Sequence, residues 1–188
     1  MERPAATEYR VLRDTIASRG SLRPVLALVG VGLWAVILTA VLAWIPYPVA
    51  AVIPLLVLVA TFEVIRPLHF GAERIGRYVQ VFYEEDGQRE RPLCDTPSWE
   101  RVAMRWSAVP GAGGHPLFVP VFFLATLANT LPVLLAQPTA TPIEMTALGV
   151  PHAAFMIWLL SVDRAMRAQR AAELEQFRAL WLGEGSRH

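Results

Sequence analysis

A row of ionisable side chains directly follows an apolar stretch in the first half of the sequence. The row consists of Glu63, Arg66, His69, Glu73 and Arg77. Residues three or four apart are neighbours on a helix, so these side chains share one helical face and can pair along it. Carboxylates, imidazole and guanidinium groups placed together can also transfer protons or bind anions. The row is therefore the first candidate for a functional site.

Three interpretations of this row remain open. It is an exposed, self-paired stripe beside anionic lipid headgroups, a surface that docks on other helices or a partner subunit, or a catalytic or ligand site. Glu63 is the strongest single candidate, because an ionisable residue at the end of an apolar span is costly and often functional. The alternative is a structural role, in which Glu63 pairs with Arg66 and anchors this part of the helix. Glu63 is expected level with Gly30, where Gly30 and Gly32 would let two helices approach closely.

Asn129 and His152 form a second candidate cluster, because each is a polar residue inside an apolar run. Asn129 lies seven residues before the end of its run, and His152 lies seven residues after the start of the next run. Each is therefore about 10 Å along its helix from the connection between the two runs. If the two helices are antiparallel neighbours, the side chains share a depth and can hydrogen-bond. The pair is then an interhelical clasp, or it lines a small polar pocket.

Familiar catalytic and metal-binding motifs are absent. The glycine-rich segment 111–115 is not followed by Lys and Ser or Thr, and the sequence contains neither C-x-x-C nor H-E-x-x-H. His69, Glu73 and His115 could supply only part of a metal site, and zinc needs three or four ligands. We therefore expect no metal and no cofactor. The single cysteine, Cys94, is expected to be an incidental free thiol.

The composition indicates an integral membrane protein. Of the 188 residues, 54% are hydrophobic and only 18% are charged, against about 25% charged in soluble domains. Four runs are apolar and almost free of charge: Val25–Ile45, Val49–Phe62, Pro116–Ala136 and Met145–Val162. A helix of roughly 20 apolar residues crosses a bilayer. The sequence therefore predicts four transmembrane helices.

The basic residues predict the topology. All 17 are Arg, of which five precede the first run, seven lie between the second and third, and five follow the fourth. The turns near 46–48 and 137–144 contain none. The positive-inside rule then places both termini and the central segment in the cytoplasm. The net charge of +1 favours no nucleic-acid partner.

The predicted fold is all-α, with four spans in two antiparallel hairpins and cytoplasmic amphipathic helices. Gly20 is expected to cap an N-terminal helix over residues 7–19, Pro24 to begin the first span, and Pro67 to kink the second helix. A further helix is expected over residues 97–107. The predicted segments are an N-terminal helix (1–24), spans 25–45 and 48–66, a cytoplasmic helical segment (67–115), spans 116–136 and 145–162, and a C-terminal helix (163–188).

The segment Glu73–Glu84, ERIGRYVQVFYE, resembles a stretch of uncharacterised bacterial membrane proteins. The order of features is also similar: a hairpin, this helix, Trp99-Glu100, a glycine-rich turn into Pro116–Phe118, and a second hairpin. The resemblance covers most of the chain and implies an integral membrane protein. It implies no activity, cofactor or catalytic residue.

These observations favour a non-enzymatic accessory or scaffolding subunit of a bacterial inner-membrane complex. Several amphipathic faces beside the bilayer favour self-association or association with other membrane subunits. The alternative is a small membrane enzyme or solute transporter that uses the Glu63–Arg77 row on the cytoplasmic face.

Overall fold

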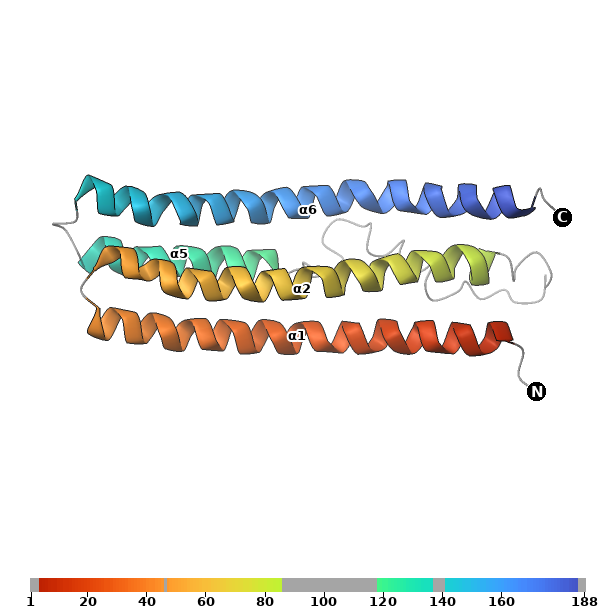
Figure 1. Ribbon diagram of the computed structural model, residues 1–188, viewed down its shortest axis with the longest axis horizontal. Coiled ribbons are helices and arrows are strands. Elements are labelled where there is room, and N and C mark those ends of the chain that lie inside the picture. Colours follow the sequence, from red (N-terminus) through yellow and green to blue (C-terminus); the bar gives the residue numbers. More distant parts are fainter. Residues whose placement is uncertain (1–3, 46, 86–117, 137–140, 186–188) are drawn as a thin grey trace. The chain divides into compact units, whose positions relative to one another are not determined.

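The computed structural model describes residues 4–45, 47–85, 118–136 and 141–185 (Figure 1). These residues are almost entirely helical and include no strand, which confirms the predicted all-α class. The elements in chain order are α1 (Pro4–Trp44), a short 3-10 helix η1 (Pro48–Ala51), α2 (Val52–Val79), a π-helical segment η2 (Gln80–Glu85), α5 (Val119–Ala136) and α6 (Pro142–Gly185).

Three helical stretches in the described part of the chain are long and apolar enough to cross a membrane. They are Thr7–Trp44, Pro48–Phe82 and Pro142–Met166. A shorter apolar helix covers Val119–Leu131. The structure is therefore compatible with a membrane protein.

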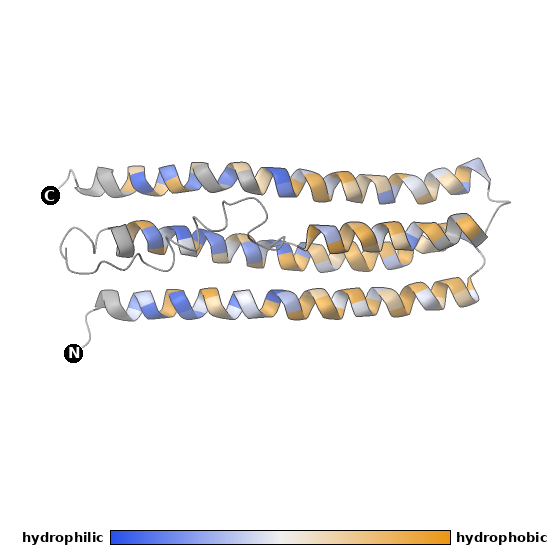
Figure 2. Ribbon diagram, turned by 180° about the vertical axis from the view of Figure 1, so that it is seen from behind, coloured by the Kyte–Doolittle hydropathy of each residue, from blue (hydrophilic) through white to orange (hydrophobic). Residues whose placement is uncertain are grey.

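The chain divides into two compact units. The apolar unit comprises Arg23–Pro67 and His115–Arg164, and the charged unit comprises Met1–Leu22, Leu68–Gly114 and Ala165–His188. Only six charged residues fall within the apolar unit. Figure 2 shows the contrast, since hydrophobic residues dominate the helices of the apolar unit and hydrophilic ones recur in the charged unit. Helices α1, α2 and α6 each supply residues to both units.

The predicted helix cap at Gly20 and the predicted helix start at Pro24 are wrong. α1 runs without interruption from Pro4 to Trp44, with Pro24 inside it and Gly20 as an ordinary helical residue. Proline removes one backbone hydrogen bond but does not force a helix to end. Here the helix-forming residues on both sides continue the pattern, so these two signals mark neither a cap nor a start.

The helix that contains the last predicted span is longer than the span itself. α6 begins at Pro142, three residues before the predicted span, and continues to Gly185 without a separate C-terminal helix. Its first turn is a capping box, in which the Thr141 backbone N–H donates to Glu144 Oε2 at 2.8 Å and the Glu144 N–H donates to Thr141 Oγ1 at 3.3 Å. The sequence T-P-I-E fits the pattern of such a box, with Pro at the first helical position.

The remaining predicted boundaries have mixed outcomes. α2 continues through Pro67, in agreement with the helical pattern predicted beyond it, and η2 extends helical structure to Glu85. The predicted helix over 97–107, together with Cys94 and His115, lies outside the described residues.

The core of the apolar unit is an aromatic cluster around Phe62, which is fully buried. Its ring makes edge-to-face contacts with Phe122 and Trp158, with centroids 5.3 and 5.1 Å apart, and a third with Phe155 at 6.3 Å. Such pairs contribute beyond their buried area. These contacts join α2, α5 and α6, which lie side by side in this unit (Figure 1).

α1 joins this core through a close helix–helix contact. A Cβ added to Gly30 would clash with the Thr61 side chain of α2, whereas one added to Gly32 would meet open space. Gly30 therefore permits the approach that the sequence predicts, and Gly32 does not take part. Thr61 is two residues from Glu63, which was expected level with Gly30.

Candidate functional site

The predicted polar row divides between the two units. Glu63 and Arg66 belong to the apolar unit. They pair with each other, Arg66 Nη2 donating to Glu63 Oε2 at 2.8 Å, and the Arg66 guanidinium lies 5.8 Å from the Trp158 ring centroid. Their side chains are 39% and 42% exposed. The geometry is that of the anchor that the sequence offers as one alternative.

The other members of the row are buried in the charged unit. His69 is 2% exposed and Arg77 is 1% exposed. An exposed, self-paired stripe is therefore the wrong interpretation for these two residues. They face α6 instead, as the docking alternative predicts: Glu173 of α6 binds Arg77, and Met166 of α6 contacts His69.

Arg77 is the centre of this charged cluster, which consists of His69, Glu73, Arg77, Arg74 and Glu173. Arg77 Nη1 donates to Glu73 Oε2 at 3.1 Å, and Arg77 Nη2 donates to Glu173 Oε2. Arg74 Nη2 donates to Glu173 Oε1 at 3.1 Å. His69 Nε2 lies 3.3 Å from Glu73 Oε1. The two carboxylates and two guanidinium groups balance in charge, as buried ions require.

The charged cluster sets the ionisation of Glu173. Burial by itself raises the pKa of the Glu173 carboxyl. Hydrogen bonds from Arg77 and Arg74, the charge of Arg77 and a hydrogen bond from Gln169 outweigh it, so that the pKa lies below its ordinary value. Glu173 is therefore ionised at neutral pH and holds α6 to α2.

The α6 side of this cluster was not predicted. Met166, Gln169 and Glu173 recur at spacings of three and four, so they form one helical face. Gln169 Nε2 donates to Glu173 Oε1 at 2.6 Å, and Met166 Sδ lies 3.1 Å from His69 Nε2. The spacing of these residues could have predicted a shared face on α6. Only the folded structure shows which face of α2 that face contacts.

The predicted contact between Asn129 and His152 is present in the apolar unit, and it is part of a larger hydrogen-bonded group. Asn129 Nδ2 lies 2.7 Å from His152 Nε2 and donates to the Ala51 carbonyl at 2.7 Å. The Trp34 indole N–H donates to Asn129 Oδ1 at 3.2 Å. One buried amide thus connects α1, η1, α5 and α6. We refer to Asn129, Trp34, Ala51 and His152 as the asparagine hub.

The partners of the hub determine its proton positions. A carbonyl only accepts and an indole only donates, so the amide of Asn129 has one allowed orientation. Its Nδ2 must then donate to His152 Nε2. His152 Nδ1 lies 2.7 Å from the Leu148 carbonyl and must donate to it. His152 is therefore the neutral tautomer that carries its proton on Nδ1.

The hub is closed to chemistry. Asn129 is fully buried and His152 is 2% exposed, and both nitrogens of the imidazole already have a partner. A satisfied network of this kind specifies packing rather than binding a solute. The geometry thus favours the clasp over a polar pocket at this position.

No group of three His, Cys, Asp or Glu side chains close enough to hold a metal occurs among the residues that the structure describes. His69 and Glu73 are adjacent, as predicted for one edge of such a site. His115, the third predicted contributor, lies outside those residues.

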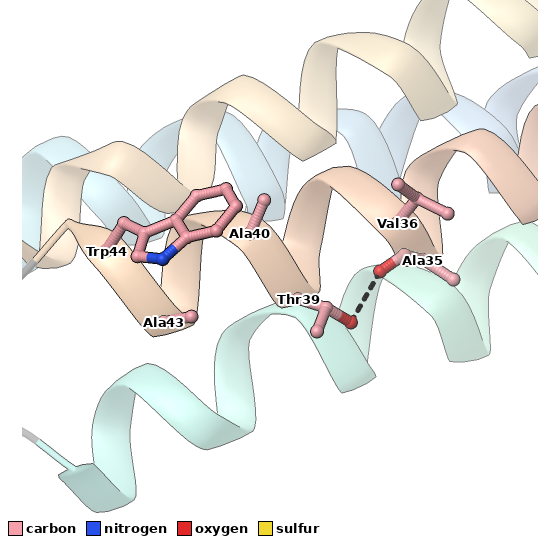
Figure 3. Close-up of a pocket in the computed structure, with 6 residues that line it drawn as sticks. All are labelled: Ala35, Val36, Thr39, Ala40, Ala43 and Trp44. Carbon is pink, nitrogen blue, oxygen red and sulfur yellow. Dashed lines mark hydrogen bonds between the residues drawn. The ribbon is translucent and has the colours of Figure 1, made fainter.

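An open apolar groove follows α1 in the apolar unit (Figure 3). It is lined by small and apolar side chains: Ala35, Val36, Thr39, Ala40, Ala43 and Trp44. Thr39 Oγ1 donates to the Ala35 carbonyl at 2.8 Å, so the hydroxyl is satisfied within the helix. The groove therefore offers a mainly apolar surface for packing.

No protein-family model, curated protein or solved structure matches this chain. The resemblance of Glu73–Glu84 to uncharacterised membrane proteins stays a prediction. The two polar clusters and the α1 groove are therefore the features from which a function can be inferred.

Proposed function

We propose that the chain is an integral protein of a bacterial inner membrane and a non-enzymatic accessory or scaffolding subunit of a membrane complex. In this proposal α1, α2, α5 and α6 each cross the bilayer, in two antiparallel hairpins. Both termini and the central segment are cytoplasmic. The three membrane-length helices and the confinement of all 17 Arg to three segments support this topology.

One observation carries the non-enzymatic part of the proposal: the polar residues best suited to chemistry are consumed by helix packing. Both Nη groups of Arg77 are bound to carboxylates. Asn129 and His152 have no free hydrogen-bonding atom in the hub. A catalytic or transport site needs groups that can contact a substrate, whereas these groups hydrogen-bond to one another.

The α1 groove supports the role as a subunit. Ala35, Thr39 and Ala43 are small residues at four-residue spacing, which lets another helix approach closely in lipid. Trp44, at one end of the groove, is 81% exposed. We assign the groove to a transmembrane helix of another subunit, in the simplest case α1 of a second copy.

Cysteine cross-linking in intact membranes tests this proposal. In a Cys94→Ala background, Val36→Cys places a thiol in the groove, and Leu124→Cys places one on α5 with similar exposure, 64% against 67%. We expect a cross-linked dimer from Val36→Cys and none from Leu124→Cys. Ala43→Leu, which fills the groove, should abolish the Val36→Cys product.

Two results would contradict the proposal. One is equal cross-linking from the groove and the α5 control. The other is a monodisperse monomer in mild detergent, with no cross-linked product from either cysteine. Protease added to sealed spheroplasts tests the topology separately, since neither terminus should be cleaved.

The alternative, a small membrane enzyme or solute transporter, is favoured by one observation: Glu63 and Arg66 remain partly exposed. Glu63→Gln should then abolish an activity or a solute flux without lowering expression. An anchor predicts instead that Glu63→Gln and Arg66→Gln both reduce the amount of folded protein.

A further inference from the structure

The ion pair between Glu63 and Arg66 leaves polar atoms of both side chains unbound. Its two hydrogen bonds end on the same oxygen, since Arg66 Nε and Nη2 donate to Glu63 Oε2 at 3.3 and 2.8 Å. In the part of the chain that the structure describes, Arg66 Nη1 and Glu63 Oε1 have no hydrogen-bond partner. Both side chains are partly exposed, so a ligand can reach the pair.

Trp158 of α6 adds a third polar group beside this pair. The Arg66 guanidinium lies over the Trp158 ring, 5.8 Å from its centroid, and the same ring packs edge-to-face on Phe62 at 5.1 Å. Trp158 is half-buried, and its indole N–H has no hydrogen-bond partner among the described residues. A connected group of three side chains therefore offers two donors, the indole N–H and Arg66 Nη1, and one acceptor, Glu63 Oε1.

This group lies at the end of the apolar unit where its helices become charged. Glu63 directly follows the apolar run 49–62 of α2, and Asp163 directly follows the run 145–162 of α6. In the proposed topology this end is level with the phospholipid headgroups of the cytoplasmic leaflet. Arginine and tryptophan are both favoured at that level, because each has an apolar body and a polar end.

We propose that Glu63, Arg66 and Trp158 bind the headgroup of a phospholipid that carries both a phosphate and a primary ammonium group, as phosphatidylethanolamine does. Arg66 and the indole N–H donate to the phosphate oxygens, and Glu63 Oε1 accepts a hydrogen bond from the ammonium. The inference rests on the proposed function only in that the chain must span a membrane.

Charge favours this headgroup over that of an anionic lipid. The charges of Glu63 and Arg66 cancel, so the site matches a ligand that also has one positive and one negative group. A partly exposed ion pair contributes little to stability, so the two side chains can adjust to a ligand at small cost. An anionic headgroup is better matched by an arginine such as Arg164, which is exposed and has no ion pair among the described residues.

Native mass spectrometry of the delipidated full chain in mild detergent tests the site. Phosphatidylethanolamine, phosphatidylcholine and phosphatidylglycerol with identical acyl chains are titrated separately. We expect one phosphatidylethanolamine per chain, bound at least about fivefold more tightly than either other lipid, because a hydrogen bond between charged groups is lost with each of them. The methylated ammonium of phosphatidylcholine cannot donate to Glu63, and phosphatidylglycerol has no ammonium.

Three variants separate a headgroup site from a general effect of charge. Glu63→Gln should remove the preference for phosphatidylethanolamine over the other two lipids. Trp158→Phe keeps a ring against Phe62 and removes the N–H, so it should weaken the binding of all three lipids. Arg164→Gln, the control, should leave the preference unchanged. Circular dichroism checks the helix content of each variant, and Trp158→Phe still tests the site if Glu63→Gln folds poorly.

The proposal is overturned if the parent binds the three lipids equally or prefers phosphatidylglycerol. It is also overturned if Arg164→Gln lowers the preference as much as Glu63→Gln. Membrane fractionation and the Val36→Cys cross-link distinguish this failure from that of the proposed function. A membrane-bound, cross-linked protein without lipid preference overturns only the headgroup site, whereas a protein absent from the membrane fraction overturns the proposed function.

Discussion

The charged unit and the apolar unit use different chemistry to hold their helices together. In the charged unit, Arg77 of α2 binds Glu173 of α6 and is also paired with Glu73 of its own helix. In the apolar unit, Asn129 connects four helical elements without a single charge. Each unit thus has a buried polar side chain that binds partners on more than one helix.

The difference follows from the surroundings of each unit. Ion pairs are strong in a protein interior, but removing charges from water is expensive unless every charge is compensated. The charged unit supplies several carboxylates and guanidinium groups for that purpose. The apolar unit contains only six charged residues. A neutral amide between an imidazole and an indole gives helix specificity there at a far smaller desolvation cost.

The largest expected effect comes from removing the centre of the charged cluster. Arg77→Met leaves Glu73 and Glu173 facing each other in a buried site, and we expect a loss of about 3–5 kcal/mol in the stability of the charged unit. Arg74→Met is the matched control, because Arg74 is 61% exposed and binds the same Glu173. It should cost about 1 kcal/mol or less. Thermal unfolding and limited proteolysis in mild detergent measure both.

Equal losses for Arg77→Met and Arg74→Met would contradict this account of the charged unit. They would show that the burial of the arginine does not determine how much it stabilises the unit. A loss confined to the apolar unit would also contradict it.

Removing the hub of the apolar unit should have the next largest effect. Asn129→Leu leaves the Ala51 carbonyl, the Trp34 N–H and His152 Nε2 without their partner, at a cost of about 2 kcal/mol. Thr126→Val is the control, because the Thr126 hydroxyl is fully buried but donates only within α5, to the Phe122 carbonyl. It should cost less than half as much.

A double-mutant cycle sharpens this prediction. Asn129→Leu and His152→Leu should show a coupling of about 0.6–2 kcal/mol in the unfolding free energy. Strict additivity would show that the two side chains do not depend on each other, and the hub would then be incidental to packing.

The close approach of α1 to α2 in the apolar unit gives a prediction about packing. Gly30→Ala places a methyl group against Thr61 and should cost about 1–2 kcal/mol. Gly32→Ala meets open space, so it should be neutral or slightly stabilising through helix propensity. The unfolding temperatures of the two variants, measured against the parent protein, test this prediction. Equal effects would mean that α1 does not pack on α2 through Gly30.

The pH dependence of the charged unit should be the smallest effect. The pKa of Glu173 is lower in the folded chain than its ordinary value near 4.5. The ionised form therefore stabilises the fold at neutral pH, and this stabilisation is lost as the pH falls below about 4.5 and through the folded pKa. The decrease in unfolding temperature from pH 7 to pH 4 should be larger for the parent protein than for Glu173→Gln. An identical decrease in both proteins would show that Glu173 does not cause the loss of stability at low pH.

Several features were predictable because they depend on local sequence alone. Apolar runs of membrane length predict the helices, and spacings of three and four along α2 place Glu63, Arg66, His69, Glu73 and Arg77 on one face. Equal distances from a turn gave the Asn129–His152 contact. Helix ends were less predictable, because Gly20 and Pro24 are also tolerated inside a long helix.

The partners of these residues were not predictable, because they are distant in the chain. Arg77 and Glu173 are 96 residues apart, and Trp34 and Asn129 are 95 apart. A polar face on one helix does not indicate which other helix will cover it. The exposed stripe and the docking surface have the same spacing, and only the position of α6 distinguishes them.

The sequence by itself determined the all-helical class, the long apolar helices and the face on which each polar side chain lies, because backbone periodicity and hydrophobicity act over a few residues. Tertiary structure alone decided that His69 and Arg77 are buried, that Glu173 and Met166 meet them, and that one asparagine joins four elements. The physical reason is that a buried polar group takes whichever partner the packed helices bring within hydrogen-bonding distance, and that choice is made only when the chain is folded.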